Sequence, residues 1–414
     1  MNFYYIVAIT CASLLVLGCL LFSYKIHFWK YAFSQQKECA KAPQDKKYAI
    51  LIPARDESKI IKDTLDSIAK QTYNKENITT FVIVEDKNDP TIDICKNYEN
   101  INSFVLPYAP GCKGGALSLA IKDIYASGKR FDGYFVIDAD NCMHEEFVEK
   151  MHNAFCAGND VVLGAKRVKH PTAQWVSCGN ALTMTFVNSM NNKCRSEHGQ
   201  NVVLQGTPLL INKTIIEDAW GGDWPLTTLA EDYELSIFCA THNFKSYYCE
   251  YAKSLYETPT SYIQSSKQRL RWVKGHNAVD FKYAKEIKSA KCKYNTGIYK
   301  FDTVFSLVPI ILMIVSAFAF LLFSVVTTIV LACLANPFWL NAMFGSLLTF
   351  ALIYIGLGFW ALFGLLADRK VSGLSKKQIA GAVFTVPMFL ISWVPVYFKS
   401  FLVKDVKWSK IKCD

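Results

Sequence analysis

The sequence predicts an α/β domain with a Rossmann-like, mainly parallel sheet, joined to α-helical transmembrane segments. Two observations carry this prediction. First, the 414 residues are 51% hydrophobic and 19% charged, with a mean hydropathy of +0.15, whereas soluble domains carry about 25% charged residues. Second, strand-like and helix-like blocks alternate after residue 47, which is typical of a parallel sheet covered by helices. The large apolar fraction also excludes a disordered chain.

The uncharged, apolar start of the chain predicts an N-terminal transmembrane anchor over residues 1–24. The stretch is long enough to cross a bilayer core of roughly 30 Å as a helix. It lacks a basic start, which favours an uncleaved anchor over a signal peptide. Lys25 and Lys30 follow directly, in a linker expected over residues 25–46, so the positive-inside rule places the next domain in the cytoplasm.

Three more apolar segments are expected as transmembrane helices within residues 303–403. They are Val304–Leu334, Leu340–Ala367 and Ile379–Leu402. Pro387 and Pro395 could interrupt the last segment and turn it into a re-entrant or interfacial piece. A basic tail follows over residues 404–414, and its side of the membrane stays open. These segments predict a multi-pass protein of the plasma membrane that contacts membrane lipids.

A soluble domain is expected over residues 47–252. Its apolar runs Lys47–Pro53, Thr80–Val84 and Tyr134–Ile137 predict strands, and Glu57–Gln71 carries apolar residues at helical spacing. In an open parallel sheet, ligands bind outside the carboxyl ends of the strands. A binding site is therefore expected just after these strand-like runs.

Acidic residues follow each of these predicted strands. Glu57 comes after the first strand, Asp86 after the second, and Asp138 and Asp140 after the third. Several carboxylates in one crevice repel one another unless a cation neutralises them. Mg²⁺ or Mn²⁺ on a diphosphate would do so with oxygen ligands. Each acid taken singly could instead cap a loop, but three acidic strand ends together favour a metal–diphosphate site.

Two further motifs have both a functional and a structural interpretation. Lys113, in the glycine-rich segment Gly111–Leu117, could place an ammonium group near phosphates, although such glycine pairs are more often plain turns. Asp232 could be a general base that takes a proton from an attacking hydroxyl. Alternatively, Thr228 and Glu231 fit a capping box at the start of a helix. Local sequence does not choose between these interpretations.

The stretch Lys253–Lys300 is strongly basic, with 11 Lys and Arg against three Asp and Glu. We expect interfacial helices over residues 253–302, attracted to anionic headgroups or to a polyphosphate substrate. A nucleic-acid partner is not expected directly before transmembrane helices. Trp272 and the arginines next to it could anchor such a helix at the headgroup level. Equally, Arg271 could pair with a pyrophosphate oxygen while Trp272 stacks on a sugar ring.

Taken in order, these motifs resemble the membrane-integrated family-two glycosyltransferases, a group that includes cellulose, chitin and hyaluronan synthases and ceramide glucosyltransferases. The matching series runs from residue 48 to residue 272 and consists of IPARDE, VEDKNDPT, KGGAL, DAD, the Leu204–Thr207 turn, AEDYELS and QRLRW. The resemblance implies a GT-A fold for the soluble domain. It also implies an inverting transfer that uses Mg²⁺ or Mn²⁺.

The resemblance further implies a role for each matching residue. Five residues would bind the sugar-nucleotide donor: Glu57, Asp86, Lys113, Asp138 and Arg271. Asp140 would bind the metal, and Asp232 would be the catalytic base. Four residues would bind the acceptor: Gly206, Thr207, Gln268 and Trp272.

The implied function is a membrane-bound enzyme that moves a sugar from a UDP-sugar onto a growing polysaccharide at the cytoplasmic face. One alternative is a non-processive enzyme with a lipid acceptor, because ceramide-type enzymes share the Gln-x-x-Arg-Trp signature. A remote alternative is an inactive, transferase-like membrane scaffold. The sugar and the linkage stay open, as does the question of whether a partner subunit or a homo-oligomer completes an export channel.

Overall fold

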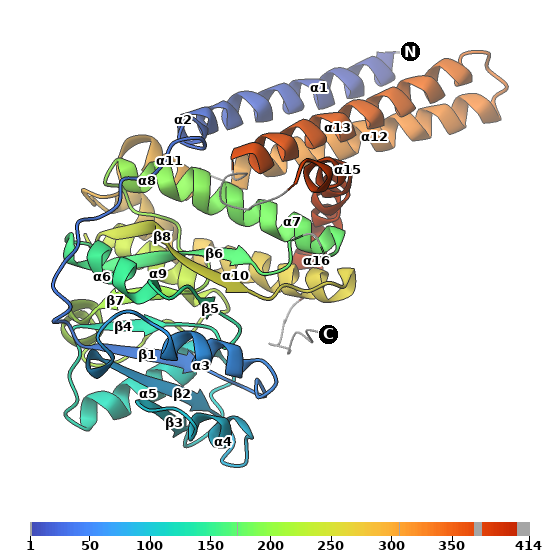
Figure 1. The fold of residues 1–414 in the computed structure, drawn as a ribbon. Coiled ribbons are helices and arrows are strands. Elements are labelled where there is room, and N and C mark those ends of the chain that lie inside the picture. The colour runs from blue at the N-terminus through green and yellow to red at the C-terminus, as the bar shows by residue number, and fades with distance from the viewer. Residues whose placement is uncertain (1, 172, 306, 368–374, 404–414) are drawn as a thin grey trace.

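In the computed structural model, which describes residues 2–171, 173–305, 307–367 and 375–403, one mixed sheet forms the centre of the soluble domain (Figure 1). The strands are β1 (Tyr48–Pro53), β2 (Ile78–Val84), β3 (Ile101–Val105), β4 (Gly133–Val136), β5 (Cys142–Met143), β6 (Val161–Val168), β7 (Leu209–Asn212) and β8 (Ser246–Tyr256). Their spatial order is β3-β2-β1-β4-β7-β6-β8-β5. Strands β3, β2, β1 and β4 are parallel, as are β6 and β8, whereas β7 is antiparallel to both of its neighbours. The predicted, mainly parallel sheet is confirmed.

Two apolar cores lie on the two faces of this sheet. Ala49 and Leu51 of β1 enter one core, while Ile50 and Ile52 enter the other, as the two-residue period of a strand requires. Helices α5 (Lys113–Ala126) and α9 (Glu231–Thr241) cover the first face. Helices α3 (Ile61–Ala69) and α6 (Phe147–Cys156) cover the second, and the short α4 (Thr91–Cys95) follows β2.

The helix after β1 begins later than the sequence predicts, at Ile61 rather than Glu57. Residues 54–60 form a turn in which Asp56 has φ 56°. The Glu57 carbonyl accepts hydrogen bonds from the N–H groups of Ile60 and Ile61, each at 3.0 Å. This turn keeps Glu57 in a loop at the strand end. At the other end of the domain, β8 runs across the predicted boundary at residue 252.

A layer of helices lies between the sheet and the most apolar helices (Figure 1). It contains α2 (Ile26–Trp29), α7 (Trp175–Met184), α8 (Lys193–Glu197), α10 (Tyr262–Ser289) and α11 (Gly297–Phe305). A π-helix over Thr185–Asn192 joins α7 to α8, so the chain is helical from Trp175 to Glu197. The QRLRW motif lies on α10, as its basic and aromatic residues predict.

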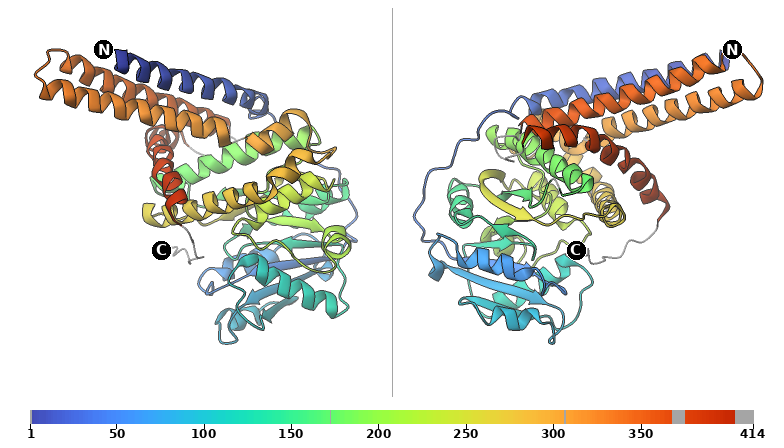
Figure 2. Two further views of the ribbon diagram at one scale, coloured as in Figure 1. Left: turned by 180° about the vertical axis from the view of Figure 1, so that it is seen from behind. Right: turned by 45° about the vertical axis from the view of Figure 1, so that its right-hand side comes forward.

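Four helical segments of the described chain are long and apolar enough to cross a membrane by length and composition: Ala12–Trp29, Val315–Cys333, Trp339–Ala367 and Lys376–Leu402. They correspond to the four predicted segments. Helices α1 (Asn2–Phe22), α12 (Leu307–Cys333) and α13 (Trp339–Ala367) lie side by side and project away from the sheet (Figure 2). The basic tail predicted over residues 404–414 lies outside the described residues.

The last apolar segment consists of two helices, α15 (Lys376–Ile391) and α16 (Trp393–Leu402), which are separated at Ser392. Pro395 has no N–H to bond the carbonyl of the residue four positions earlier, which favours a break here, whereas Pro387 lies within α15. Helix α15 packs on α7, and α16 packs on α10. The interruption therefore turns α16 toward the soluble domain.

A buried cluster of charges joins the short 3₁₀-helix after α1, Ser23–Lys25, to α11. Asp302 accepts hydrogen bonds from Lys25, from the Tyr24 hydroxyl at 2.5 Å and from Arg195 Nη2 at 2.7 Å. The side chains of Arg195 and Asp302 are each 1% exposed. Burial alone would raise the pKa of Asp302, but Lys25 and Arg195 outweigh burial and lower that pKa to about 2. Asp302 therefore stays charged and balances part of the positive charge.

Asp302→Asn is expected to destabilise the protein by about 3–5 kcal/mol, because two cations would be left without their counter-charge. The thermal unfolding of the detergent-solubilised protein measures this effect. Asp93→Asn is the control, because the Asp93–Lys96 pair is exposed and such pairs contribute about 1 kcal/mol or less. Equal melting temperatures for the two variants would contradict a structural role for the Asp302 cluster.

Candidate active site

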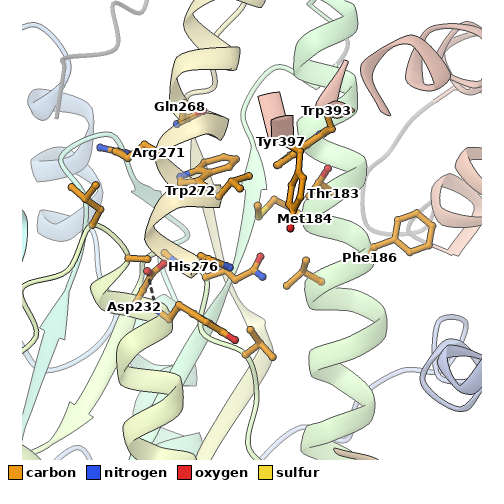
Figure 3. A pocket seen from close by; sticks show the side chains of 18 of the residues that line it. Thr183, Met184, Phe186, Asp232, Gln268, Arg271, Trp272, His276, Trp393 and Tyr397 are labelled. Carbon is orange, nitrogen blue, oxygen red and sulfur yellow. Dashed lines mark hydrogen bonds between the residues drawn. The ribbon is translucent and has the colours of Figure 1, made fainter. Parts of the chain in front are cut away.

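A cavity of about 1450 Å³ opens at the carboxyl ends of β1, β2 and β4, where the sequence predicts a binding site. Glu57, Asp138 and Asp140 line it from the strand ends. Asp232, at the start of α9, and residues of α10 line the facing side (Figure 3). The structure thus brings residues from distant parts of the chain around one space.

Asp138 is held between two lysines. Lys113 Nζ lies 2.7 Å from Asp138 Oδ1, and Lys166 Nζ lies 3.5 Å from Asp138 Oδ2. Burial alone would raise the pKa of Asp138, but the two ammonium groups hold it well below its usual range. Lys113 also lies 3.3 Å from Glu231, and these acids raise its pKa despite its burial. Asp138 and Lys113 are therefore charged at neutral pH.

Asp140 lies beside this cluster and has an oxygen without a partner. Its Oδ1 atom is buried and makes no hydrogen bond within the described chain. Burial raises the pKa of Asp140 to about 6. Divalent cations such as Mg²⁺ prefer oxygen ligands, and an unpaired buried carboxylate oxygen is otherwise costly. The residues present therefore fit a divalent cation such as Mg²⁺ or Mn²⁺, which Asp140 Oδ1 could bind.

The Gly206–Thr207 turn lies between two of the acids. Thr207 is 1% exposed, and its hydroxyl donates a hydrogen bond to Asp138 Oδ2 at 2.5 Å. The N–H of Gly206, which has φ 82°, donates to Asp232 Oδ2. Gly206 lines the cavity, but Thr207 lies behind Asp138. The predicted acceptor contact is therefore not supported at Thr207, which instead orients the aspartate.

Asp232 lies in the first turn of α9 and is fixed by backbone groups. Its Oδ1 accepts a hydrogen bond from the N–H of Tyr233 at 2.9 Å, while its Oδ2 binds Gly206. The alternative capping box is wrong, because the N-cap of α9 is Ala230 and carries no side-chain cap. The hydroxyl of Thr228 instead donates to the buried Glu234 at 2.9 Å. Asp232 is left facing the cavity.

One side of α10 carries Gln268, Arg271 and Trp272 into the cavity (Figure 3). Arg271 Nε is buried and has no hydrogen-bond partner within the described residues. Arg269 points elsewhere, with its guanidinium 4.7 Å from the Phe389 ring and 2.9 Å from Ser392 Oγ. Gln268, Arg271 and Trp272 thus line the cavity, whereas Arg269 packs against the end of α15.

The acids after β2 differ from the prediction by one residue. Glu85 lines the cavity and lies 3.2 Å from Arg55 Nε. Asp86 is exposed, and its Oδ1 accepts a hydrogen bond from the N–H of Asn88 at 2.8 Å. Glu57 lines the cavity as predicted. A nucleoside at this strand end would therefore meet Glu57 and Glu85.

Some cavity residues have no role assigned from the sequence, among them Glu85, Lys166 and His276. Glu85 directly precedes Asp86 at a strand end, so the same argument applies to it. His276 follows Trp272 by four residues and therefore shares its face of the helix. Lys166 lies on β6, in a stretch with no motif, and the sequence carries no signal for it.

Residues 43–275, more than half of the chain, match the family described as "Glycosyltransferase like family 2". The chain belongs to this family. The family that the series of motifs resembles is therefore confirmed.

Relatives of this family-2 glycosyltransferase include the "Probable glycosyltransferase YdaM" of Bacillus subtilis (strain 168), which is 26% identical over 256 residues. That match covers 60% of this chain and 59% of YdaM, so the chain spans less than two thirds of the relative's length. One similar solved structure is the mannosyltransferase PcManGT from Pyrobaculum calidifontis, in complex with GDP-Man and Mn²⁺. It has a TM-score of 0.60 at 15% sequence identity, and the match covers 96% of this chain and 99% of PcManGT. TarS of S. aureus has a TM-score of 0.42 at 14% identity, covering 63% and 43%. The likeness to PcManGT confirms the predicted GT-A fold.

In this glycosyltransferase, Gly275 allows α10 to approach the segment before Asp232. A Cβ atom at Gly275 would lie 2.8 Å from Ala230 Cβ and 3.1 Å from Ala230 N. We expect Gly275→Ala to displace α10, to lower the free energy of unfolding by about 1–3 kcal/mol and to reduce transfer by about 10²-fold. Gly381→Ala in α15 is the control, because nothing lies within 4 Å of its added atom. Equal transfer rates in the two variants would contradict this close approach.

Proposed function

We propose that this protein is a membrane-bound, inverting glycosyltransferase that moves a sugar from a nucleotide-diphosphate sugar to a hydroxyl group of a lipid. One observation carries the choice of acceptor. The same cavity that holds Asp138, Asp140 and Asp232 is also lined by the apolar side chains of membrane helices. A sugar donor at one end and a lipid at the other would therefore meet at Asp232.

The polar end of the cavity carries the charges that a nucleotide diphosphate needs. Lys113, Lys166 and Arg271 supply positive charge. Asp140, with Asp138 beside it, would hold Mg²⁺ or Mn²⁺, which would neutralise the diphosphate when bound. Arg271 would donate hydrogen bonds to the oxygens of the departing diphosphate, because its buried Nε is not already paired with a described residue.

The nucleoside would lie at the ends of β1 and β2. Glu57 faces this part of the cavity, and Glu85 takes the place predicted for Asp86. Carboxylates can accept hydrogen bonds from the N–H groups of a base or from ribose hydroxyls. We retain a UDP-sugar as the proposed donor, on the resemblance of the motifs.

Asp232 would take the proton of the acceptor hydroxyl. Hydrogen bonds from Gly206 and Tyr233 hold its carboxylate in place. As the proton passes to Asp232, the acceptor oxygen bonds to the anomeric carbon, and the bond from that carbon to the diphosphate breaks with its electron pair. Attack on the face opposite the diphosphate inverts the anomeric configuration. The departing diphosphate needs no proton, so one general base suffices.

The other end of the cavity suits acyl chains. Its walls come from α1, α12, α13 and α16, with the apolar residues Phe22, Met313, Phe318, Ile353, Trp360, Tyr397 and Phe401. A lipid tail buries its surface there at a gain of about 25 cal/mol per Å². A growing polysaccharide, the other predicted acceptor, would place many hydroxyl groups against the same walls without hydrogen-bond partners, which is costly. The geometry therefore favours the lipid.

We place the catalytic domain at the cytoplasmic face of the plasma membrane. Lys25 and Lys30 follow the first apolar segment, and basic residues at a membrane boundary favour the cytoplasmic side. The donor would then be drawn from the cytoplasm. The acceptor would reach Asp232 from the bilayer.

A side chain that fills the apolar end tests this proposal. Gly356 of α13 lines the cavity, and nothing lies within 4 Å of a Cβ atom built there. Gly356→Phe should raise the KM for a lipid acceptor by about tenfold or more and leave nucleotide binding unchanged, since the donor binds at the opposite end. Gly345→Phe, on the same helix and also in open space, is the control. A loss of nucleotide binding, or equal acceptor KM values in both variants, would overturn the proposed lipid path.

A further inference from the structure

His276 is a polar residue of the cavity that the mechanism above does not use. It lies on α10 one turn after Trp272, and both side chains project toward the space that Asp232 faces (Figure 3). An imidazole at this place would meet the part of the acceptor next to the reacting hydroxyl.

The ring of His276 is held in one orientation. It stacks on the ring of Tyr233, with 4.3 Å between the centroids and 10° between the planes. Tyr233 is in turn fixed, because its hydroxyl donates a hydrogen bond to Asp280 Oδ1 at 2.8 Å. Tyr233 also directly follows Asp232 in the chain. The imidazole and the carboxylate are therefore positioned by the same residue.

The nitrogens of His276 are available to a ligand. Neither of them makes a hydrogen bond to another described residue, although the ring lines the cavity. Burial lowers the pKa of His276, against the opposing effects of Asp232 and Asp280, so the ring is neutral at pH 7. A neutral imidazole offers one N–H donor and one nitrogen acceptor.

We propose that His276 binds the acceptor headgroup through a second polar group next to the hydroxyl that Asp232 deprotonates. This inference rests on the proposed role of Asp232. A lipid with a single hydroxyl gives its proton to Asp232. Once this lipid has displaced water, however, the imidazole of His276 has no hydrogen-bond partner. A lipid with a vicinal diol satisfies both residues. The acceptor class is therefore a lipid whose headgroup carries adjacent hydroxyls or another hydrogen-bonding neighbour, as in a glycerol or sugar headgroup.

Two probe lipids and two variants test this assignment. Monooleoylglycerol carries a vicinal diol, and oleyl alcohol carries one hydroxyl. His276→Phe keeps a flat ring for stacking on Tyr233 but removes both nitrogens, and His276→Gln restores a hydrogen-bonding group. Nucleotide release without any acceptor reports on folding and on the donor site. The measured quantity is kcat/KM for each lipid.

The wild type is expected to prefer the diol by about tenfold, the discrimination typical of one unpaired buried hydrogen bond. His276→Phe should lose this preference, because its kcat/KM should fall about tenfold more on the diol than on oleyl alcohol, and His276→Gln should regain part of the preference. Equal losses on both lipids, or no loss on the diol, would overturn the assignment. If the wild type forms no Asp232-dependent lipid product at all, the proposed lipid acceptor fails as well, so the two failures are distinguishable.

Discussion

Asp232→Asn is expected to reduce glycosyl transfer by about 10²–10⁴-fold, the usual contribution of a general base. The variant keeps the size of the side chain and leaves Asp138, Asp140 and Lys113 untouched. Nucleotide binding should therefore stay within about twofold of wild type, since the substitution removes no donor contact. Titration with the nucleotide and a transfer assay at saturating donor separate the two effects.

This variant needs a check on folding, because both carboxylate oxygens of Asp232 accept backbone hydrogen bonds. An asparagine places its NH₂ group against one of these N–H donors, which costs about 1–3 kcal/mol of local stability. Melting temperatures of wild type and variant measure that cost. Asp93→Asn, on the exposed surface of α4, is the matched control. If folded Asp232→Asn protein transferred sugar at the wild-type rate, this result would contradict the role of Asp232 as the general base.

Asp140→Asn is expected to abolish the part of nucleotide binding that depends on Mg²⁺ or Mn²⁺. Its Oδ1 is the buried carboxylate oxygen for which a cation is the fitting partner. Affinity for UDP in the presence of Mn²⁺ should fall by about 10²-fold, while affinity in chelator should not change. Isothermal titration with and without the metal measures both values.

Metal-free stability gives an independent readout of the same residue. Burial raises the pKa of Asp140 to about 6, above its value in an unfolded chain, so the ionised form opposes folding at pH 7. Asp140→Asn should therefore raise the melting temperature in chelator and cancel the stabilisation that Mn²⁺ gives to wild type. Wild-type metal dependence in the variant would show that Asp140 has a purely structural role.

The sheet and most of the acidic site could be predicted because they depend on local sequence. The apolar run that forms β1 is followed at once by a polar turn, and a parallel sheet brings such turns to one edge. The exact acid after β2 could not be predicted, since a shift of one residue at a strand end reverses the direction of the side chain. Glu85 therefore faces the cavity in place of Asp86.

Contacts between distant parts of the chain left no local signal. Asp302 binds Lys25 across 277 residues, and Thr207 binds Asp138 across 69 residues. A local pattern can also predict the wrong contact. Thr228 and Glu231 have the spacing of a capping box, but the hydroxyl of Thr228 donates its hydrogen bond to Glu234 and not to a backbone N–H at the start of α9. The apolar end of the cavity, which favours a lipid acceptor, also depends on the packing of α1, near the start of the chain, with helices that follow residue 306.

The most direct test of a lipid-acceptor glycosyltransferase is the fate of a labelled sugar. Purified protein is incubated with Mg²⁺ or Mn²⁺, a membrane lipid extract and a panel of labelled UDP-glucose, UDP-N-acetylglucosamine, UDP-galactose, UDP-glucuronate and GDP-mannose. Products are partitioned into organic solvent and sized, with Asp232→Asn alongside. We expect one donor to yield an organic-soluble product with wild type and none with the variant. Label in a high polymer would restore the polysaccharide prediction, and no transfer from any donor would contradict the account.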